Sequence, residues 1–526
     1  MPRQLPKRQR AFARRSRTGC RTCRVRHLKC DETPGACRNC SSNGWVCDGY
    51  EVNRLPRPRD VVKSHTALQH PLVESGFRWA MTSDEKRCVS FFLHRTIPSL
   101  TSYYDSSLWQ ELVLQMCYSE PAVYHAVAAL SAVNQDLEMN GIPRPGGDLG
   151  STWHGFALEQ CARSFGLLSK RQILQDPQLR EVLLVCCLLF VMLEVVCGRF
   201  DDATAHLQSG LAILKETRSE RLLQGLLFVP VEESLLEAFL HLEVQAMHHG
   251  MVPSALQLGI YGQQYGEKLH EFLTLRDVQQ ILNPITDATF SFLARCWRAP
   301  DAEILARYAE VHTEQHQILS ALSQFSVDFA RFHRTFYHQQ TDKEQRGSNT
   351  AYLTYLNLKL ACKTALYSKS CPLPVSFLEE YEELLSVTLA AMGKLGDRPI
   401  MTIDIAICPA LFTIAARCPD YSVRWKAIEA LREWPHCEGY LNSTLSADIV
   451  TEQMKRELRY LWTEMNTPGS SLPPGLFFES REGVPHVSIQ GNWLSLVPDK
   501  RLAQSLKTVS TAKSWSCVKA SGILSS

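Results

Sequence analysis

Residues 20–47 read CRTCRVRHLKCDETPGACRNCSSNGWVC, and this stretch decides how the N-terminal part of the chain folds. Its six cysteines stand at positions 20, 23, 30, 37, 40 and 47, so the spacing C-x2-C-x6-C occurs twice. Two cysteines separated by two residues can reach one tetrahedral zinc ion without straining the backbone. The repeat therefore predicts a small module that is held together by metal ions.

The number of cysteines favours two zinc ions that share ligands. Two tetrahedral ions need eight ligand positions, and the repeat offers six sulfur atoms, so two of them must bridge. In a twofold repeat the symmetric bridging candidates are Cys20 and Cys37. The two predicted ligand sets are then Cys20, Cys23, Cys30 and Cys37 for one ion, and Cys37, Cys40, Cys47 and Cys20 for the other.

Three other interpretations of the cysteines explain the sequence less well. A disulfide scaffold belongs to secreted proteins, but the opening MPRQLPKRQRAFARRSR has no apolar segment of the secretory kind. A single four-cysteine site would leave two thiols idle and the repeat unexplained. A zinc module that binds protein, as RING and LIM types do, would not require the basic charge around these cysteines.

Basic charge is concentrated at the N-terminal end of the chain. Residues 1–59 hold fifteen Lys or Arg and four acidic residues, a formal charge of +11, whereas the whole chain carries +2. The remaining 467 residues are therefore mildly acidic, at −9. A basic module on an acidic body is typical of a protein whose one end binds nucleic acid.

The stretch resembles the zinc-cluster (Zn₂Cys₆) domain of fungal transcription regulators. The resemblance rests on the six cysteines, the basic run 24–29, Asp31, Pro34 and the Arg38-Asn39-Cys40 step. It implies two zinc ions per chain, and a first short helix that enters the DNA major groove to read a CGG triplet. The segment from Cys23 to Cys30 is long enough for two helical turns.

The same resemblance assigns roles to individual side chains. The base-reading pair falls on Arg26 and His27, of which Arg26 can form a bidentate contact with guanine. Arg24 and Lys29 are expected to contact phosphates. Three arginines ahead of the module lie close enough to touch the DNA backbone as well: Arg14, Arg15 and Arg17. Trp45 is expected to be a packing anchor.

Beyond the module the sequence predicts one large all-α domain. The run 181–197 is apolar all round, as in a helix buried on every side, and Gly198 ends it before Asp201 and Asp202 open the next helix. Its uninterrupted apolar core of twelve residues is too short to span a bilayer, so we expect no membrane partner. The predicted organisation is a basic disordered arm (1–17), the zinc module (18–50), a linker (51–80), the helical domain (81–466) and a tail (467–526).

The helical domain also resembles the regulatory domain that follows the zinc cluster in many fungal regulators, through residues 91–96, 119–127 and 198–207. No catalytic motif accompanies it, and the chain is not predicted to be an enzyme. Glu237, His241 and His248 share one helical face, which we interpret as an exposed polar face rather than a metal site.

Together these features predict a nuclear transcription regulator that binds double-stranded DNA and acts through the transcription machinery or co-regulators. No run of three heptads follows the module, so a homodimer, if one forms, must form through the helical domain, and a monomer reading one triplet is the alternative. By resemblance, the targets belong to one metabolic or secondary-metabolite gene set. A competing hypothesis is a zinc-stabilised adaptor that binds proteins without reading DNA sequence.

Overall fold

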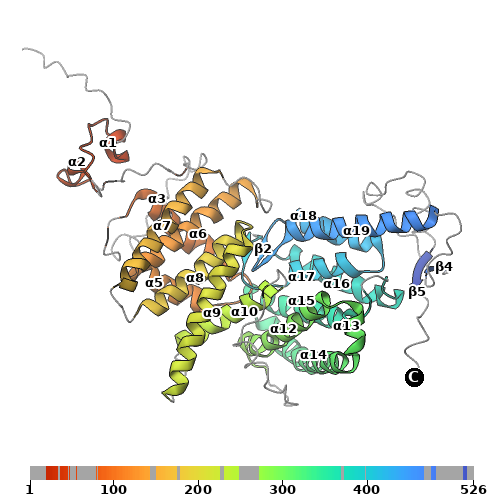
Figure 1. Ribbon diagram of the computed structural model, residues 1–526. Helices are drawn as coiled ribbons and strands as arrows, with labels where there is room; N and C mark the ends of the chain where they lie inside the picture. The colour runs from red at the N-terminus through yellow and green to blue at the C-terminus, as the bar shows by residue number, and fades with distance from the viewer. Residues whose placement is uncertain are drawn as a thin grey trace, which may run out of the picture.

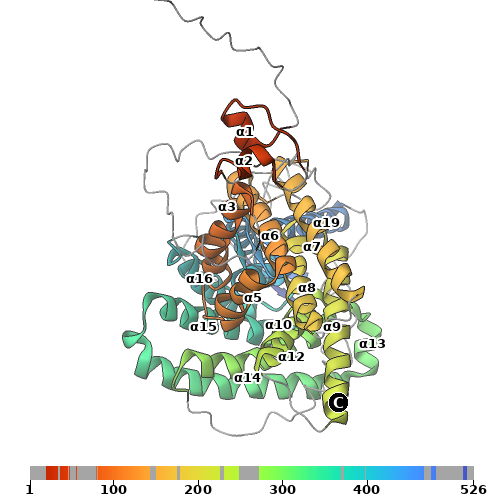
Figure 2. The same ribbon diagram turned by 90° about the vertical axis from the view of Figure 1, so that its left-hand side faces the viewer.

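The computed structural model describes residues 19–33, 36–45, 47, 55, 79, 81–142, 150–173, 178–224, 230–247, 251, 272–368, 372–396, 398–466, 476–480 and 513–517. Within these residues the chain is mostly α-helical, which confirms the predicted all-α class. A small N-terminal module lies beside one end of a large helical body (Figure 1). Figure 2 shows the same module resting over α3 when the molecule is turned.

The first half of the body packs around one apolar core. Its elements are α3 (Ser83–Phe91), the π-helical turn η3 (Phe92–Thr96), α4 (Ile97–Leu100), the π-helical turn η4 (Leu108–Leu112), α5 (Val113–Ser119), α6 (Pro121–Asn140), α7 (Thr152–Ile173), α8 (Leu179–Val196), α9 (Phe200–Leu223) and α10 (Pro230–Met247).

The second half contains two further cores, one around α12, α14 and α15 and one around α16 to α19. Its helices are α12 (Leu275–Arg298), α13 (Asp301–Ala306), α14 (Tyr308–Phe336), α15 (Asp342–Thr364), α16 (Leu378–Gly393), α17 (Ile407–Arg417), α18 (Tyr421–Glu433) and α19 (Ser443–Asn466), with short 3₁₀ turns η5 (Tyr337–Gln339) and η6 (Val375–Phe377).

Helix α8 forms the centre of the first half. From Val182 to Val196 every side chain except Leu183 is buried, which confirms the prediction of a helix covered on all sides. The helix ends where the sequence predicts, because Gly198 adopts a φ of +71°, a conformation that side chains with a Cβ disfavour. None of the described helices combines the length and the apolar character that a bilayer span requires.

Five short strands interrupt the helical pattern. β1 (Met401–Thr402) pairs in parallel with β2 (Cys437–Glu438), and β2 pairs antiparallel with β3 (Leu441–Asn442). In the tail, β4 (Leu476–Ser480) pairs antiparallel with β5 (Lys513–Cys517). The sequence showed no strand signal at β1 to β3, because strands of two residues are too short to produce an alternating pattern.

The small sheet joins the two halves of the body. The side-chain oxygen of Gln245, on α10, accepts a hydrogen bond of 3.0 Å from the backbone N–H of Tyr440. Ser99 donates one of 2.8 Å to the carbonyl of Met401. Met401 and Tyr440 are fully buried in the core of the first half. The sheet is therefore the point at which the chain returns from the second half to the first.

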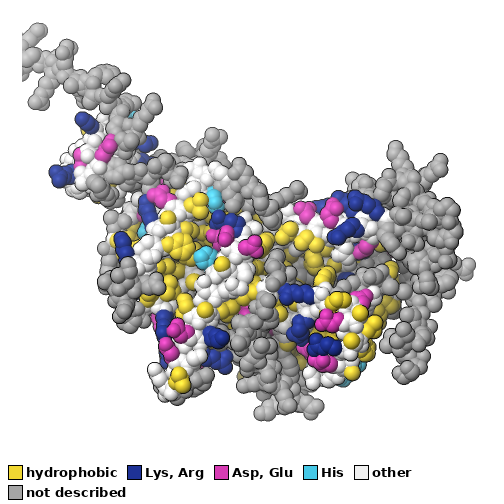
Figure 3. Space-filling model, viewed as in Figure 1, with side chains coloured by type: hydrophobic (Ala, Val, Ile, Leu, Met, Phe, Trp, Pro, Cys, Tyr) yellow, Lys and Arg dark blue, Asp and Glu magenta, His cyan; other side chains and the backbone are white. Residues whose placement is uncertain are grey.

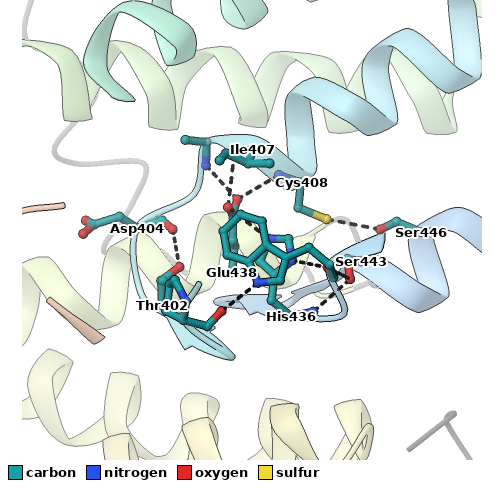
Figure 4. A network of polar contacts seen from close by, with 11 residues as sticks. Thr402, Asp404, Ile407, Cys408, His436, Glu438, Ser443 and Ser446 are labelled. Atoms are coloured by element: carbon teal, nitrogen blue, oxygen red, sulfur yellow. Dashed lines mark hydrogen bonds and ion pairs between the residues drawn. The ribbon is translucent and has the colours of Figure 1, made fainter. Parts of the chain in front are cut away.

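Glu438 is fully buried beside this sheet and organises the start of α17 (Figure 4). Its carboxylate accepts hydrogen bonds from the backbone N–H groups of Ala406, Ile407 and Cys408 at 2.8, 3.2 and 3.1 Å. His436 lies 3.3 Å away on the same carboxylate. Because the first N–H groups of a helix have no partner within the helix, Glu438 supplies the acceptor that α17 lacks.

Replacing Glu438 by Ala should lower the free energy of unfolding by about 3 kcal/mol, because three buried backbone donors and His436 would lose their acceptor. Urea unfolding of the full chain, followed by far-ultraviolet circular dichroism, measures this effect. The matched control is Glu433→Ala, which removes an exposed ion pair with Arg398 and should cost less than about 1 kcal/mol. Equal costs for the two variants would contradict the role given to Glu438.

Candidate metal centre and nucleic-acid interface

The twofold repeat of the sequence is also a twofold repeat of the backbone. Helix α1 (Arg21–Val25) begins directly after Cys20, and α2 (Arg38–Ser41) begins directly after Cys37. Each of these two cysteines caps its helix, because its sulfur accepts the N–H of the residue three positions on. The N–S distance is 3.3 Å both at Cys23 and at Cys40.

Both helices end in the same way. In the first half the N–H of Leu28 donates to the carbonyl of Cys23 at 2.9 Å, and in the second half Trp45 donates to Cys40 at the same distance. The residues before them adopt left-handed conformations, His27 with φ +55° and Gly44 with φ +68°. This arrangement reverses the chain after a single helical turn.

The segment from Cys23 to Cys30 is long enough for two helical turns but does not form them, since α1 ends at Val25. The chain must turn back after Val25 because the sulfur of Cys30 accepts the backbone N–H of Cys20 at 3.3 Å. The second half repeats this contact between the sulfur of Cys47 and the N–H of Cys37, also at 3.3 Å. His27 consequently lies beyond the end of α1 rather than on it.

The six sulfur atoms form two groups whose members all lie within 4.8 Å of one another. Cys20 and Cys37 belong to both groups. The first group adds Cys23 and Cys30, and the second adds Cys40 and Cys47. In the part of the chain that the structure describes, no other group of cysteine, histidine or acidic side chains has this geometry.

The distances between these sulfurs fit zinc and exclude disulfides. They are 3.6 Å for Cys20–Cys37 and Cys23–Cys37, and 3.7 Å for Cys20–Cys40. A tetrahedral site with Zn–S bonds of about 2.3 Å has edges of about 3.8 Å, whereas a disulfide bond measures about 2.05 Å. The donor set thus matches zinc in both chemistry and spacing.

Asp31 ties the two halves of the module together. Its carboxylate accepts the hydroxyl of Thr33 and the backbone N–H groups of Asn39 and Arg38, the last two at 3.1 and 3.0 Å. These hydrogen bonds, led by that of Thr33, hold the pKa of Asp31 well below its usual value. Because both backbone donors belong to the first turn of α2, the residue after Cys30 fixes where the second helix begins.

The predicted DNA-contacting side chains of the module lie on its surface. Arg24, His27 and Lys29 are exposed, whereas Arg26 is half-buried. Figure 3 shows Lys and Arg side chains on the outer face of the module, away from the body. Arg14, Arg15 and Arg17 lie outside the described residues.

Trp45 has a different place from the one predicted. It is 53% exposed and therefore is no packing anchor. The guanidinium of Arg26 lies over its ring, 4.4 Å from the centroid, in cation–π geometry. Nη1 of Arg26 is buried there without a hydrogen-bond partner among the described residues. In the sequence repeat, Trp45 is the counterpart of Leu28, which lies two residues after Arg26.

Arg21 connects the module to the body, a contact that no sequence pattern predicts. Its guanidinium lies 3.5 Å from the carboxylate of Asp84, which is almost completely buried at the start of α3. The backbone N–H of Leu55 donates to the same carboxylate at 3.4 Å, and Leu55 is buried in the core of the first half. The carboxylate of Asp84 therefore contacts both the first helix of the module, through Arg21, and the linker, through Leu55.

Comparison with known protein families places both parts of the chain. Residues 18–56 match the model of the fungal Zn(2)-Cys(6) binuclear cluster domain. Residues 87–453 match the model of the fungal specific transcription factor domain. The module thus carries two zinc ions, as the resemblance implied, and the description of neither family is that of an enzyme.

Several curated relatives share these features. The aspercryptin biosynthesis cluster-specific transcription regulator atnN of Emericella nidulans is 24% identical over 84% of this chain and 87% of its own length. The transcription regulator lscL of Purpureocillium lilacinum is 26% identical over 37% of this chain and 48% of its own. The transcription factor afumD of Aspergillus fumigatus is 30% identical over 23% of this chain and 33% of its own. No solved structure matches the chain.

We propose that the six module cysteines are the zinc ligands and that Cys20 and Cys37 bridge the two ions. Bound zinc supplies the folding energy that a module of this size cannot obtain from an apolar core. The Cys37→Ser variant should therefore lose affinity for both ions, and Cys47→Ser should lose affinity mainly for one. Native mass spectrometry during titration with a chelator counts the ions that remain.

The control for this experiment is Cys88→Ser, because Cys88 is fully buried in the helical body and belongs to neither sulfur group. This variant should keep two zinc ions at the chelator concentration that strips Cys37→Ser. A Cys37→Ser protein that holds two ions as tightly as the wild type would refute the bridging assignment.

Proposed function

This chain belongs to the fungal specific transcription factor family, and from this premise we propose that it is a nuclear regulator that reads CGG-type triplets in double-stranded DNA. The observation that carries the proposal is the placement of basic side chains at the end of α1. Arg24, His27 and Lys29 project from the short turn that the sulfur atoms hold in place. They give the module a basic edge on a short helix, and a helix is an element that the major groove admits.

Arg26 is the residue that discriminates between bases. Its guanidinium can donate two parallel hydrogen bonds to O6 and N7 of guanine, the commonest specific contact in the major groove. Stacking on Trp45 restricts the guanidinium to a small range of orientations, so less rotational freedom is lost when the base is bound.

The other basic residues position the module rather than specify the sequence. Arg24 on α1 and Lys29 before Cys30 are exposed and suited to phosphate contacts. His27 adds a donor beyond the helix end, while Arg14, Arg15 and Arg17 extend the basic charge ahead of the module. Their contribution is electrostatic and sensitive to salt.

The variants Arg26→Ala and Arg24→Ala should weaken DNA binding in different ways. Arg26→Ala should remove roughly 1–3 kcal/mol of discrimination at one base pair and leave most of the non-specific affinity. Arg24→Ala should weaken all duplexes alike and reduce the slope of affinity against salt by about one. Titrations of the zinc-loaded full chain with CGG duplexes and single-mismatch duplexes separate the two effects.

Trp45→Ala is the companion variant. It leaves Arg26 in place but removes the ring beneath it, so it should reduce discrimination partially and at the same base pair as Arg26→Ala. If Arg26→Ala and Arg24→Ala lower affinity equally for matched and mismatched duplexes, Arg26 does not read a base. If the wild type itself does not discriminate, the adaptor hypothesis replaces this proposal.

The helical body is proposed to modulate the activity of the DNA-bound module. Contact of Arg21 and Leu55 with Asp84 supports such a role, because it links the module directly to α3. A curated relative that matches 84% of this chain is described as specific for one biosynthesis cluster, which supports control of one biosynthetic gene set. A homodimer through the body and contacts with the transcription machinery complete the proposal.

A further inference from the structure

The body contains a large cleft that the proposed DNA readout does not use. It has a volume of about 2440 Å³ and lies between α10, α12, α14 and the segment from α4 to η4. Small-molecule sites in proteins commonly occupy about 300–1,000 Å³, so the cleft has room for a ligand of that kind. One wall is the π-helical turn η4, a distortion that is frequent at functional sites.

The cleft is acidic. Eight carboxylate side chains line it, against two permanently cationic ones, Arg276 and Lys343. Lys343 is already paired with Asp105, with 2.6 Å between Nζ and Oδ1. The charge of the cleft therefore favours a cation and disfavours an anion.

His241, which the sequence had placed on an exposed polar face, lies inside this cleft. It is only 20% exposed, and its Nδ1 is 3.5 Å from a carboxylate oxygen of Asp287. Burial acts to lower the pKa of His241, but the hydrogen bond and charge of Asp287, together with the charge of Asp404, outweigh it, so that its pKa is raised. The imidazolium and Asp287 thus neutralise each other. His248 lies outside the described residues.

Asp404 is the second carboxylate that the charge of His241 acts on. It lines the cleft next to β1, and Figure 4 shows its carboxylate pointing away from the Glu438 network. The carboxylate accepts no hydrogen bond from any described residue, and burial raises the pKa of Asp404 to about 7. The positive charge of His241 offsets only part of this effect of burial, and a cation bound at the carboxylate would stabilise its ionised form further.

A second polar group in the cleft also has no partner. Tyr103 is 2% exposed, and its hydroxyl makes no hydrogen bond among the described residues. Buried polar groups normally are hydrogen-bonded, so an orphaned hydroxyl in a cleft indicates a missing ligand atom. Tyr103 and Asp404 both line the cleft and interact electrostatically.

The walls around these polar groups are apolar. Buried side chains from five elements form them, namely Leu100, Trp109, Leu240, Ile285 and Phe325. A divalent metal ion would not use such walls, and the described residues of the cleft contain no group of metal-ligand geometry. The combination of a carboxylate that accepts no hydrogen bond from a described residue, an orphaned hydroxyl and apolar walls fits an organic cation better than a metal ion.

We propose that this cleft binds a small organic amine, whose ammonium group lies against Asp404 and Tyr103 and whose apolar body packs on the walls. The proposal does not depend on how the module reads DNA. It assigns to the helical body a ligand site that is built from residues of both halves of the chain.

The test uses two fluorescent probes that share one apolar ring system. Dansylcadaverine carries an ammonium group on its tail, whereas N-dansylglycine carries a carboxylate. Fluorescence titration of the zinc-loaded full chain should show saturable binding of dansylcadaverine, at least tenfold tighter than that of N-dansylglycine. Asp404→Asn should weaken dansylcadaverine binding at least tenfold, and Tyr103→Phe should weaken it severalfold.

Asp448→Asn serves as the control, because this aspartate lies on α19 and does not line the cleft. It should leave probe affinity unchanged, and all variants should bind duplex DNA as the wild type does. Equal binding of the two probes, an unchanged affinity in Asp404→Asn, or no saturable binding up to about 1 mM would each overturn the proposal. None of these outcomes would bear on DNA recognition by the module.

Discussion

The close approach of six sulfur atoms is the constraint on which the DNA-binding end of this protein depends. The buried cluster of the described module residues consists of cysteines alone, so no apolar core holds the two helices together. Each sulfur that approaches a backbone N–H also fixes where a helix begins or where the chain turns back. The same sulfur atoms therefore serve in metal binding, helix capping and chain reversal. They also fix the position of α1, which carries the basic edge.

The helical body rests on a different kind of constraint. Its two halves meet at a sheet of very short strands, and the buried carboxylate of Glu438 organises the chain there by capping α17. Asp84 plays a comparable part at the other end, where the module and the linker reach α3. Buried carboxylates that accept hydrogen bonds from several groups thus lie where one part of the molecule meets another. Loss of these hydrogen bonds would weaken the contact between the parts.

Much of this architecture could be predicted from the sequence. The cysteine repeat indicated both the number of zinc ions and a twofold module, and the apolar run of α8 indicated a helix at the centre of a core. These predictions succeed because metal spacing and helical periodicity are local properties of the chain. The length of the segment from Cys23 to Cys30 did not indicate where α1 ends, since the sulfur of Cys30 reaches back to Cys20 and leaves no room for a second turn.

The remaining differences arise from contacts between residues that are distant in the chain. The stacking of Arg26 on Trp45 joins the two repeats, and the pairing of Arg21 with Asp84 spans 63 residues. His241 resembled a surface residue because its partner, Asp287, lies on another helix. No pattern within one helix or strand predicts contacts of this kind. The cleft of the body could therefore be recognised only from the folded structure.

The central claim is that the zinc module reads DNA sequence, and selection from a random duplex library tests it most directly. The zinc-loaded full chain, at physiological salt, should enrich duplexes that contain CGG. Paired triplets at one fixed spacing would indicate a dimer held by the helical body, and single triplets would indicate a monomer. A selected pool with the same composition as the starting library would contradict the account.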